Sequence, residues 1–169
     1  DVLQLLNPSG YYDKIGFAFP ESKNKVLDDF INEKFIRRND AGSYDITNLG
    51  ALLISKDLNS FEGLARKSIR VIWYKDNNRL DTVREKVFSE GYAVSYDKIV
   101  EYVLTIIPQE EIIEGSIRKT KLGYPEIAIR ELIANLMIHQ AIEQKGTSPM
   151  IELFKDRMEF SNAGSPLVP

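Results

Sequence analysis

The spacing of apolar residues in the first third of the chain predicts two helices. Apolar positions in 22–38 recur at helical intervals, so we expect one amphipathic helix that ends in basic residues. Turn formers follow it, and either Asp45 or Thr47 can cap a second helix. The buried side of that second helix is expected to consist of three leucines, Leu49, Leu52 and Leu53.

The middle of the chain alternates between strand and helix patterns. Residues 69–74 are rich in β-branched and aromatic side chains and precede turn formers at 76–78, which predicts a strand followed by a turn. Helical spacing over 95–107 predicts a helix that Pro108 ends. The stretch 111–120 favours another strand, because a glycine in its middle weakens the helical alternative.

A long helix and two short strands are predicted near the end of the chain. Proline at the first turn and an acidic residue after it favour a helix over 125–142. Residues 150–164 then offer two short strands joined around Lys155–Arg157. Helices and strands thus follow one another without a repeat, and α+β is the expected fold class.

Length and charge narrow the functional classes. With 169 residues, 43% of them hydrophobic, the chain can form one domain or two small lobes. A net charge of -3 gives no overall basic field that would attract nucleic acid or an anionic membrane. Any contact with DNA therefore needs a local basic patch.

The absence of cysteine and of long apolar runs narrows the expected kinds of site, the location and the partners. Without cysteine there is no disulfide, no thiolate zinc site and no cysteine nucleophile, and a cytoplasmic location is expected. No apolar run reaches the length of a membrane span, so a membrane is not an expected partner. Because the chain opens at Asp1 without a start methionine, we interpret it as a piece of a longer protein.

A polar stripe borders the apolar face of the helix predicted over 125–142. Glu131, Asn135 and His139 are spaced by four residues, so they lie on one side of that helix. An amide oxygen can bind a hard cation such as Mg²⁺, and a carboxylate one turn away can orient or deprotonate water. The ordinary alternative is a solvated helix edge with a boundary histidine. The five apolar positions expected to face the core are Ile129, Leu132, Ile133, Leu136 and Met137.

The order of the following elements resembles the first half of the GHKL, or Bergerat-type, ATP-binding fold. A helix with the pattern E-x-x-x-N is followed by a hairpin and then by "SNAGSP". The resemblance implies that Glu131 is the hydrolytic base and that Asn135 binds Mg²⁺. The stretch from Asn162 to Pro166 then corresponds to the family's D-x-G-x-G box, with an amide where the family has a carboxylate and a proline where it has the second glycine. From local sequence alone, "SNAG" is equally typical of a hairpin turn.

Most of the chain resembles one bacterial group, predicted transcriptional regulators that are also described as RecG-related ATP-dependent DNA helicases. That group joins a Schlafen AlbA-type nucleic-acid-binding domain to a divergent GHKL domain. Two departures lie near the nucleotide site: Ala141 stands where the group usually has aspartate, and Ala163 stands where it usually has proline. Five blocks resemble the group in order, 44–58, 66–79, 90–113, 124–140 and 149–168.

The resemblance implies an organisation and a set of partners. Residues 1–119 become an N-terminal α+β connecting region, and 120–169 become an incomplete GHKL-like ATPase half. ATP and Mg²⁺ are implied cofactors of the full-length protein, with no tight binding expected for this chain alone. DNA is an implied partner, and a homo-oligomer is a further expectation. The residues implied to contact the nucleotide are Asn135, His139, Asn162 and Gly164.

Two other interpretations come from different functional classes. Residues 22–55 can be a winged-helix-like module in which Lys34, Arg37 and Arg38 contact the phosphates of a nucleic acid. The ordinary alternative is a solvated helix end, since acidic residues lie on the same segment. The chain can also be a connector or oligomerisation module that carries no chemistry of its own. No Walker loop is found in the sequence.

Overall fold

The chain forms two compact units in the computed structural model, which describes residues 1–107, 109–114, 117–144 and 148–164. The first unit contains 1–68 and 88–95, and the second contains 69–87 and 96–169. The predicted boundary at residue 119 therefore differs from the observed division. Its physical reason is strand pairing, because the segment 69–74 joins a sheet with strands from the end of the chain. The predicted helix stop at Pro108 and the end of the "SNAGSP" box lie outside the described residues.

The first unit is a small mixed fold of helices and one hairpin. Its 3₁₀-helices cover Val2–Gln4, Leu58–Ser60 and Ala65–Lys67, its α-helices are α1 (Pro8–Ile15), α2 (Lys23–Asn32) and α3 (Asn48–Ile54), and its strands are β1 (Ile36–Arg38) and β2 (Tyr44–Ile46). The two strands pair antiparallel, with Ile36 opposite Ile46. Together with the second unit, this mixture of helices and strands confirms the α+β class.

The helix predicted over 22–38 is six residues too long at its C-terminal end. Ser22 is the N-cap, close to the predicted start, but α2 ends at Asn32. Lys34 has a positive φ of 61°, and the amide of Phe35 donates to the carbonyl of Phe30 at 2.8 Å. This is the hydrogen-bond pattern that closes a helix and turns the chain away from it. Arg37 and Arg38 consequently lie on a strand, not on a helix end.

Aromatic side chains form the core of the first unit. The ring of Tyr11 meets the rings of Phe30 and Phe35 edge-on, at centroid distances of 5.5 and 5.4 Å. Such edge-to-face pairs add to the gain from area burial. Helix α3 starts at the predicted cap, because the Thr47 hydroxyl accepts from the amide of Gly50 at 3.0 Å. Of its three leucines Leu52 is buried and Leu53 is half-buried, whereas Leu49 is exposed, contrary to the prediction.

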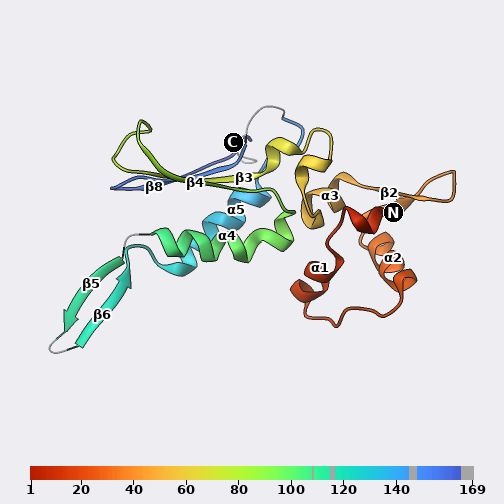
Figure 1. Ribbon diagram of the computed structural model, residues 1–169, viewed down its shortest axis with the longest axis horizontal. Helices are drawn as coiled ribbons and strands as arrows, with labels where there is room; N and C mark the ends of the chain where they lie inside the picture. Colours follow the sequence, from red (N-terminus) through yellow and green to blue (C-terminus); the bar gives the residue numbers. More distant parts are fainter. Residues whose placement is uncertain (108, 115–116, 145–147, 165–169) are drawn as a thin grey trace, which may run out of the picture. The chain divides into compact units, whose positions relative to one another are not determined.

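The second unit is a four-stranded sheet with two helices on one face (Figure 1). The order in the sheet is β4-β3-β7-β8. Strands β3 and β7 pair parallel, with Val71 opposite Ile151, and β7 and β8 pair antiparallel. Strand β4 was not predicted from the sequence. The strands are β3 (Ile69–Tyr74), β4 (Thr82–Phe88), β7 (Met150–Leu153) and β8 (Met158–Ser161).

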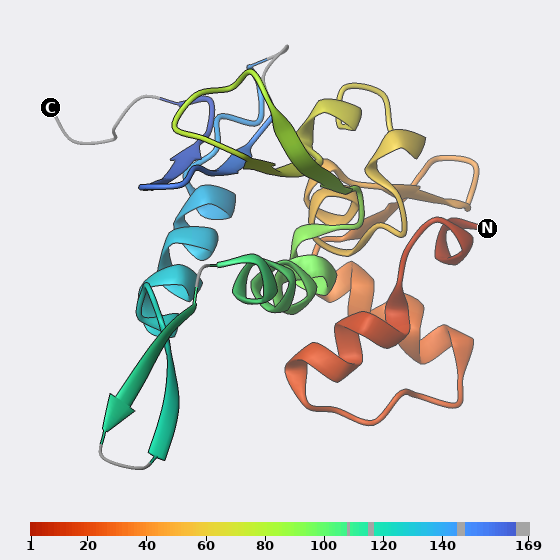
Figure 2. The same cartoon turned by 60° about the vertical axis from the view of Figure 1, so that its left-hand side comes forward.

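Helices α4 (Tyr92–Ile106) and α5 (Glu126–Ile138) lie on the same face of this sheet in both views (Figures 1 and 2). The first four residues of α4 belong to the first unit and the rest to the second. A separate hairpin between the two helices consists of β5 (Gln109–Glu114) and β6 (Ile117–Leu122). The buried apolar residues of this layer include Val71, Ile99, Val100, Val103, Ile129, Ile133, Leu136, Ile151 and Leu153.

Helix α5 differs from the prediction in its end and in part of its core face. The predicted helix continues to Ile142, but α5 ends at Ile138. The reason is that the amide of Ala141 donates to the carbonyl of Ala163 at 2.7 Å instead of continuing the helix. Leu132, predicted to face the core, is 42% exposed. Among the described residues, no helix has both the length and the apolar character needed to cross a membrane.

Candidate functional site

The predicted nucleotide site begins on helix α5, where Glu131 and Asn135 lie one turn apart. The side-chain amide of Asn135 donates to Glu131 Oε1 at 3.2 Å. The bond occupies the amide nitrogen, so the amide oxygen of Asn135 is the atom suited to a cation. Glu131 is exposed and Asn135 is half-buried, which leaves the carboxylate in contact with water. The helical spacing of E-x-x-x-N therefore brings these two groups together as expected.

The "SNAG" segment packs against the C-terminal end of α5. The side-chain amide of Asn162 donates to the backbone carbonyl of Leu136 at 3.2 Å. One residue further on, the Ala163 carbonyl accepts from the amide of Ala141 at 2.7 Å. A Cβ added at Gly164 would lie 3.0 Å from the carbonyl oxygen of His139, so this position favours glycine through close backbone approach. Two hydrogen bonds, at Asn162 and Ala163, thus hold the loop to the helix end, and Gly164 lies close to it.

His139 is the C-cap of α5 and is exposed. Its backbone amide donates to the carbonyl of Asn135 at 3.0 Å, and its backbone carbonyl faces Gly164. The end of α5 at His139 therefore lies close to the loop at Gly164. All five predicted nucleotide-site residues, Glu131, Asn135, His139, Asn162 and Gly164, lie on α5 or on the loop that packs against its end.

These residues suit a magnesium nucleotide better than a tightly held bare metal. In the described part of the chain, no group of three His, Cys, Asp or Glu residues is arranged to hold a metal ion. Mg²⁺ usually takes only one or two protein ligands and completes its shell with water and substrate phosphates. A single amide oxygen from Asn135 beside the Glu131 carboxylate meets that requirement.

The hydrogen bond of Asn162 also bears on base recognition. Because its amide nitrogen donates to the carbonyl of Leu136, its amide oxygen is left as the acceptor. An acceptor at this position suits an exocyclic amino group, as found on adenine, and does not suit the carbonyl oxygen of guanine.

A separate group of basic residues lies in the first unit. Lys34, Arg37 and Arg38, which the sequence placed on one helix end, line a cavity of about 490 Å³ after the end of α2 and along β1. We call this cavity the basic groove. Its remaining lining residues are Asp28, Ile31, Ile36 and Thr47. The structure thus keeps the three cations together although it assigns them to different elements.

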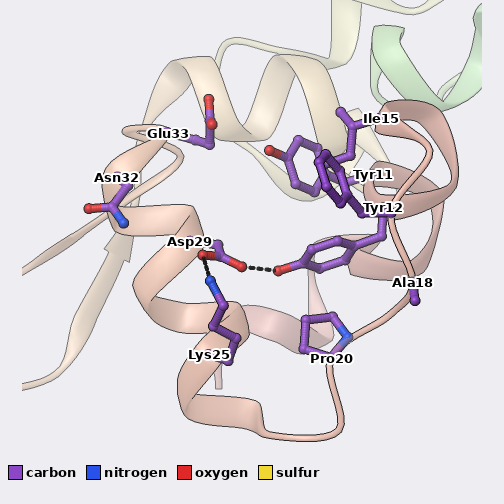
Figure 3. A pocket seen from close by; sticks show the side chains of 10 residues that line it. Tyr11, Tyr12, Ile15, Ala18, Pro20, Lys25, Asp29, Asn32 and Glu33 are labelled. Atoms are coloured by element: carbon purple, nitrogen blue, oxygen red, sulfur yellow. Dashed lines mark hydrogen bonds and ion pairs between the residues drawn. The ribbon is translucent and has the colours of Figure 1, made fainter.

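A second cavity of about 490 Å³ has aromatic and acidic walls and was not predicted (Figure 3). The Tyr12 hydroxyl donates to Asp29 Oδ2 at 2.7 Å, and Lys25 pairs with the same carboxylate. These bonds, first from Lys25 and then from Tyr12, hold the pKa of Asp29 below its usual value. Burial and the bond to Asp29 raise the pKa of Tyr12. Tyr12 and Asp29 are 17 residues apart, so no local sequence pattern indicates their pairing.

A buried carboxylate on the sheet has a partner that is even more distant in the sequence. The Glu152 side chain is only 2% exposed and receives hydrogen bonds from Arg79 at 2.7 and 3.0 Å and from the Tyr74 hydroxyl at 3.1 Å. The Arg79 contact, followed by the Tyr74 bond, keeps the pKa of Glu152 low against the opposing effect of burial. Arg79 also contacts Glu159 at 2.7 Å. This network ties the β3–β4 connection to β7 and β8.

Comparison with known proteins supports the fold. The class shared by both units is α+β, and the full arrangement has a counterpart among solved structures. It is similar to the crystal structure of the DIP2311 protein from Corynebacterium diphtheriae, with a TM-score of 0.65 and 18% sequence identity over 98% of this chain. The chain spans about a third of that protein, covering 32% of its length. No protein-family model and no curated protein matches the sequence.

Proposed function

We propose that the chain is a segment of a transcriptional regulator of the RecG-related type, and that its second unit supplies one wall of a GHKL-like nucleotide site. The observation that carries the proposal is the packing of the Asn162–Gly164 loop against the end of α5. It brings the candidate base-reading residue to the same helix as Glu131 and Asn135. The chain's coverage of only 32% of its structural neighbour is consistent with a partial site.

Each residue has a distinct role in this proposal. Asn135 supplies its amide oxygen to Mg²⁺, and Glu131 orients or deprotonates the water that attacks the terminal phosphate. Asn162 presents its amide oxygen to an amino group of the base, while Gly164 permits the close approach of the loop. His139, the C-cap of α5, lies beside the loop and is proposed to contact the nucleotide. ATP and Mg²⁺ are the proposed cofactors of the full-length protein, with weak binding by this chain alone.

The proposed partners are DNA and a second copy of the protein, in the cytoplasm. The regulator resemblance supports DNA, and the absence of cysteine favours a reducing compartment. Nucleotide occupancy is the proposed signal, so a change at the second unit is expected to alter how the full-length protein contacts DNA.

The test is nucleotide binding and hydrolysis by the full-length protein. Asn135→Ala is expected to remove Mg²⁺-dependent binding, and Glu131→Gln is expected to retain binding and lose hydrolysis. Asn162→Asp is expected to keep a preference for ATP over GTP, whereas Asn162→Ala loses the preference. Glu126→Gln is a matched control, because Glu126 is an exposed acid on the same helix that pairs with Arg130.

Isothermal titration and phosphate release separate these effects. If Asn135→Ala binds ATP with wild-type Mg²⁺ dependence, and Glu131→Gln hydrolyses it at the wild-type rate, the proposed site is wrong. If Glu126→Gln lowers hydrolysis as much as Glu131→Gln, the effect is general to the helix charge and the role given to Glu131 fails.

A further inference from the structure

We infer that the basic groove of the first unit binds the phosphate backbone of nucleic acid through Lys34, Arg37 and Arg38. The inference rests on the proposed role of DNA as a partner, and it is independent of the nucleotide site in the second unit. Three observations carry it: the cavity that the three cations line, the conformation of Lys34 and the weak engagement of the two arginines.

The three cations line one cavity although they belong to different structural elements. Lys34 follows the end of α2, whereas Arg37 and Arg38 lie on β1. All three are exposed and line one cavity of about 490 Å³. Phosphate oxygens of a nucleic acid are spaced along a strand, so an open groove with several donors suits them better than an enclosed pocket does.

Lys34 stands in a conformation that normally selects glycine. Its φ is 61°, and it is the one non-glycine residue with a positive φ among the residues that the structure describes. The amide of Lys34 donates to the carbonyl of Ile31 at 3.0 Å, in the turn that ends α2. Glycine is the usual residue at such a helix end because other side chains are strained there. A lysine at a position that favours glycine is the reason for testing its side chain below.

The two arginines keep hydrogen-bonding capacity for a ligand. Arg37 is 75% exposed in its side chain and lies 3.8 Å from Asp45, which is a loose surface contact. The Arg38 guanidinium lies 5.7 Å from the centre of the Tyr44 ring and 3.5 Å from its hydroxyl. A guanidinium has five N–H donors, so these contacts orient the group without using all of them.

The acidic residues around the groove set the strength of binding. Asp28 lines the groove and Asp45 faces Arg37, so the three positive charges are opposed by two negative ones. The chain as a whole has a net charge of -3 and adds no long-range attraction. Binding is therefore expected to be weak and strongly salt-dependent, as for a backbone contact without base readout.

The order of elements favours nucleic acid over a free anion. Helices α1 and α2 are followed directly by the β1–β2 hairpin, which is the helix–helix–hairpin order of winged-helix modules. In such modules the hairpin contacts the backbone of the duplex beside the helices. An isolated phosphate would use only part of a groove whose cations are distributed over two elements.

The test measures binding of the 169-residue chain to a fluorescein-labelled 20-base-pair duplex by anisotropy at several salt concentrations. Lys34→Gly is expected to weaken binding by about threefold to tenfold and to reduce the salt slope by about one. Arg37→Gln combined with Arg38→Gln is expected to weaken it by about tenfold to a hundredfold, with a slope reduced by about two. Lys23→Gln is the matched control, since Lys23 is an exposed cation at the other end of α2.

Stability measurements keep the Lys34 variant interpretable. Because glycine relieves the positive φ, Lys34→Gly is expected to unfold at a higher temperature than the wild type while binding DNA less tightly. This opposite change in stability and binding cannot result from a damaged fold.

Several results would overturn the inference. They are no shift of the duplex by the wild-type chain at low salt, unchanged affinity in the double arginine variant, and equal weakening by Lys23→Gln and Lys34→Gly. Full displacement of the duplex by inorganic phosphate at matched ionic strength would also overturn it, because it would assign the groove to a free anion. None of these results involves Glu131, Asn135 or Asn162, so the nucleotide proposal is tested separately.

Discussion

Removing Arg79 should destabilise the second unit, and this loss of stability should become smaller in mild acid. The proposed change is Arg79→Met, which keeps an unbranched side chain near Phe154 and removes the guanidinium. Arg79 donates two hydrogen bonds to Glu152, at 2.7 and 3.0 Å, and Glu152 is 2% exposed in its side chain. The variant leaves this carboxylate buried, with the Tyr74 hydroxyl at 3.1 Å as its remaining side-chain donor in the described network.

The expected loss follows from the exposure of the two partners. Breaking a fully buried ion pair by removing one partner costs about 3–5 kcal/mol. Arg79 is 58% exposed in its side chain, so water screens the pair and can partly replace the lost donors. We therefore expect the free energy of unfolding to fall by about 2 kcal/mol at pH 7.

The pH dependence gives the more specific signature. In the wild type the pKa of Glu152 is lowered, so its stabilising effect is present above the unfolded pKa of about 4.3 and is lost as the pH falls through the lower folded pKa. Without Arg79 the strongest influence that lowers this pKa is gone, so the pKa of Glu152 rises relative to the wild type. The folded variant then takes up a proton at a higher pH than the folded wild type does, so its deficit relative to the wild type should shrink as the pH falls from 7 to 5.

Urea unfolding followed by fluorescence reports on this unit, because Trp73 is the single tryptophan and lies in β3. The matched control is Arg70→Met, which removes an arginine of β3 that contacts Glu85 at 2.7 Å. The side chains of this pair are 40% and 39% exposed. The control is expected to cost less than about 1 kcal/mol, with no such pH effect. A deficit in Arg79→Met that stays constant or grows from pH 7 to pH 5 would refute the reasoning.

Two further predictions concern the first unit. Gly50→Ala should lower the free energy of unfolding by about 3 kcal/mol, measured by thermal unfolding, because the added Cβ would lie 2.2 Å from the backbone oxygen of Phe35. At Gly42 an added Cβ meets open space, so Gly42→Ala should cost only about 1 kcal/mol for its positive φ. Equal losses in the two variants would contradict this. Tyr12→Phe should cost about 1 kcal/mol at pH 7 by removing the bond to Asp29. Since the pKa of Asp29 is lowered, circular dichroism should show that cost shrinking as acid protonates the carboxylate below its unfolded pKa of about 3.9; a constant cost would contradict the assignment.

The sequence predicted the elements whose signals are local. Thr47 caps α3, the strand over 69–74 is present, and the two strands joined around Lys155–Arg157 form the β7–β8 hairpin. In each case the residues that define the element are neighbours in the chain. Hydroxyl caps, β-branched runs and short turns act over a few residues and can therefore be read without the fold.

The errors arose where distant backbone decides the local conformation. Phe35 and Ile36 continue a helical apolar pattern, but the pairing of Ile36 with Ile46 and the turn at Lys34 place them after the helix. Strand β4 has six exposed residues and a single buried one, so its pattern gave no core signal. Likewise, the helix over 125–142 ends early because Ala141 bonds to Ala163, a partner that local periodicity does not indicate.

The sites described above also combine contacts that the local sequence indicates with contacts that it does not. The spacing of Glu131 and Asn135 predicted that they lie on one side of the helix, and the structure adds a hydrogen bond between them. Bonds such as Arg79 to Glu152 and Tyr12 to Asp29 join residues 73 and 17 positions apart. The local sequence around these residues does not identify the partner, and only the folded backbone brings the two side chains together.

The interleaving of the two units has a consequence for how the chain is made. The first unit is completed only by 88–95, which supplies the Ser89 carbonyl that accepts from the Leu58 amide at 2.7 Å. During synthesis, β3 and β4 emerge before these residues, whereas the parallel partner of β3 appears only with Met150. About half of the chain is therefore translated before β3 can pair with β7, and until then β3 has no strand on its β7 side. A ribosome stalled between residues 95 and 150 should thus carry a protease-resistant first unit attached to an unprotected β3.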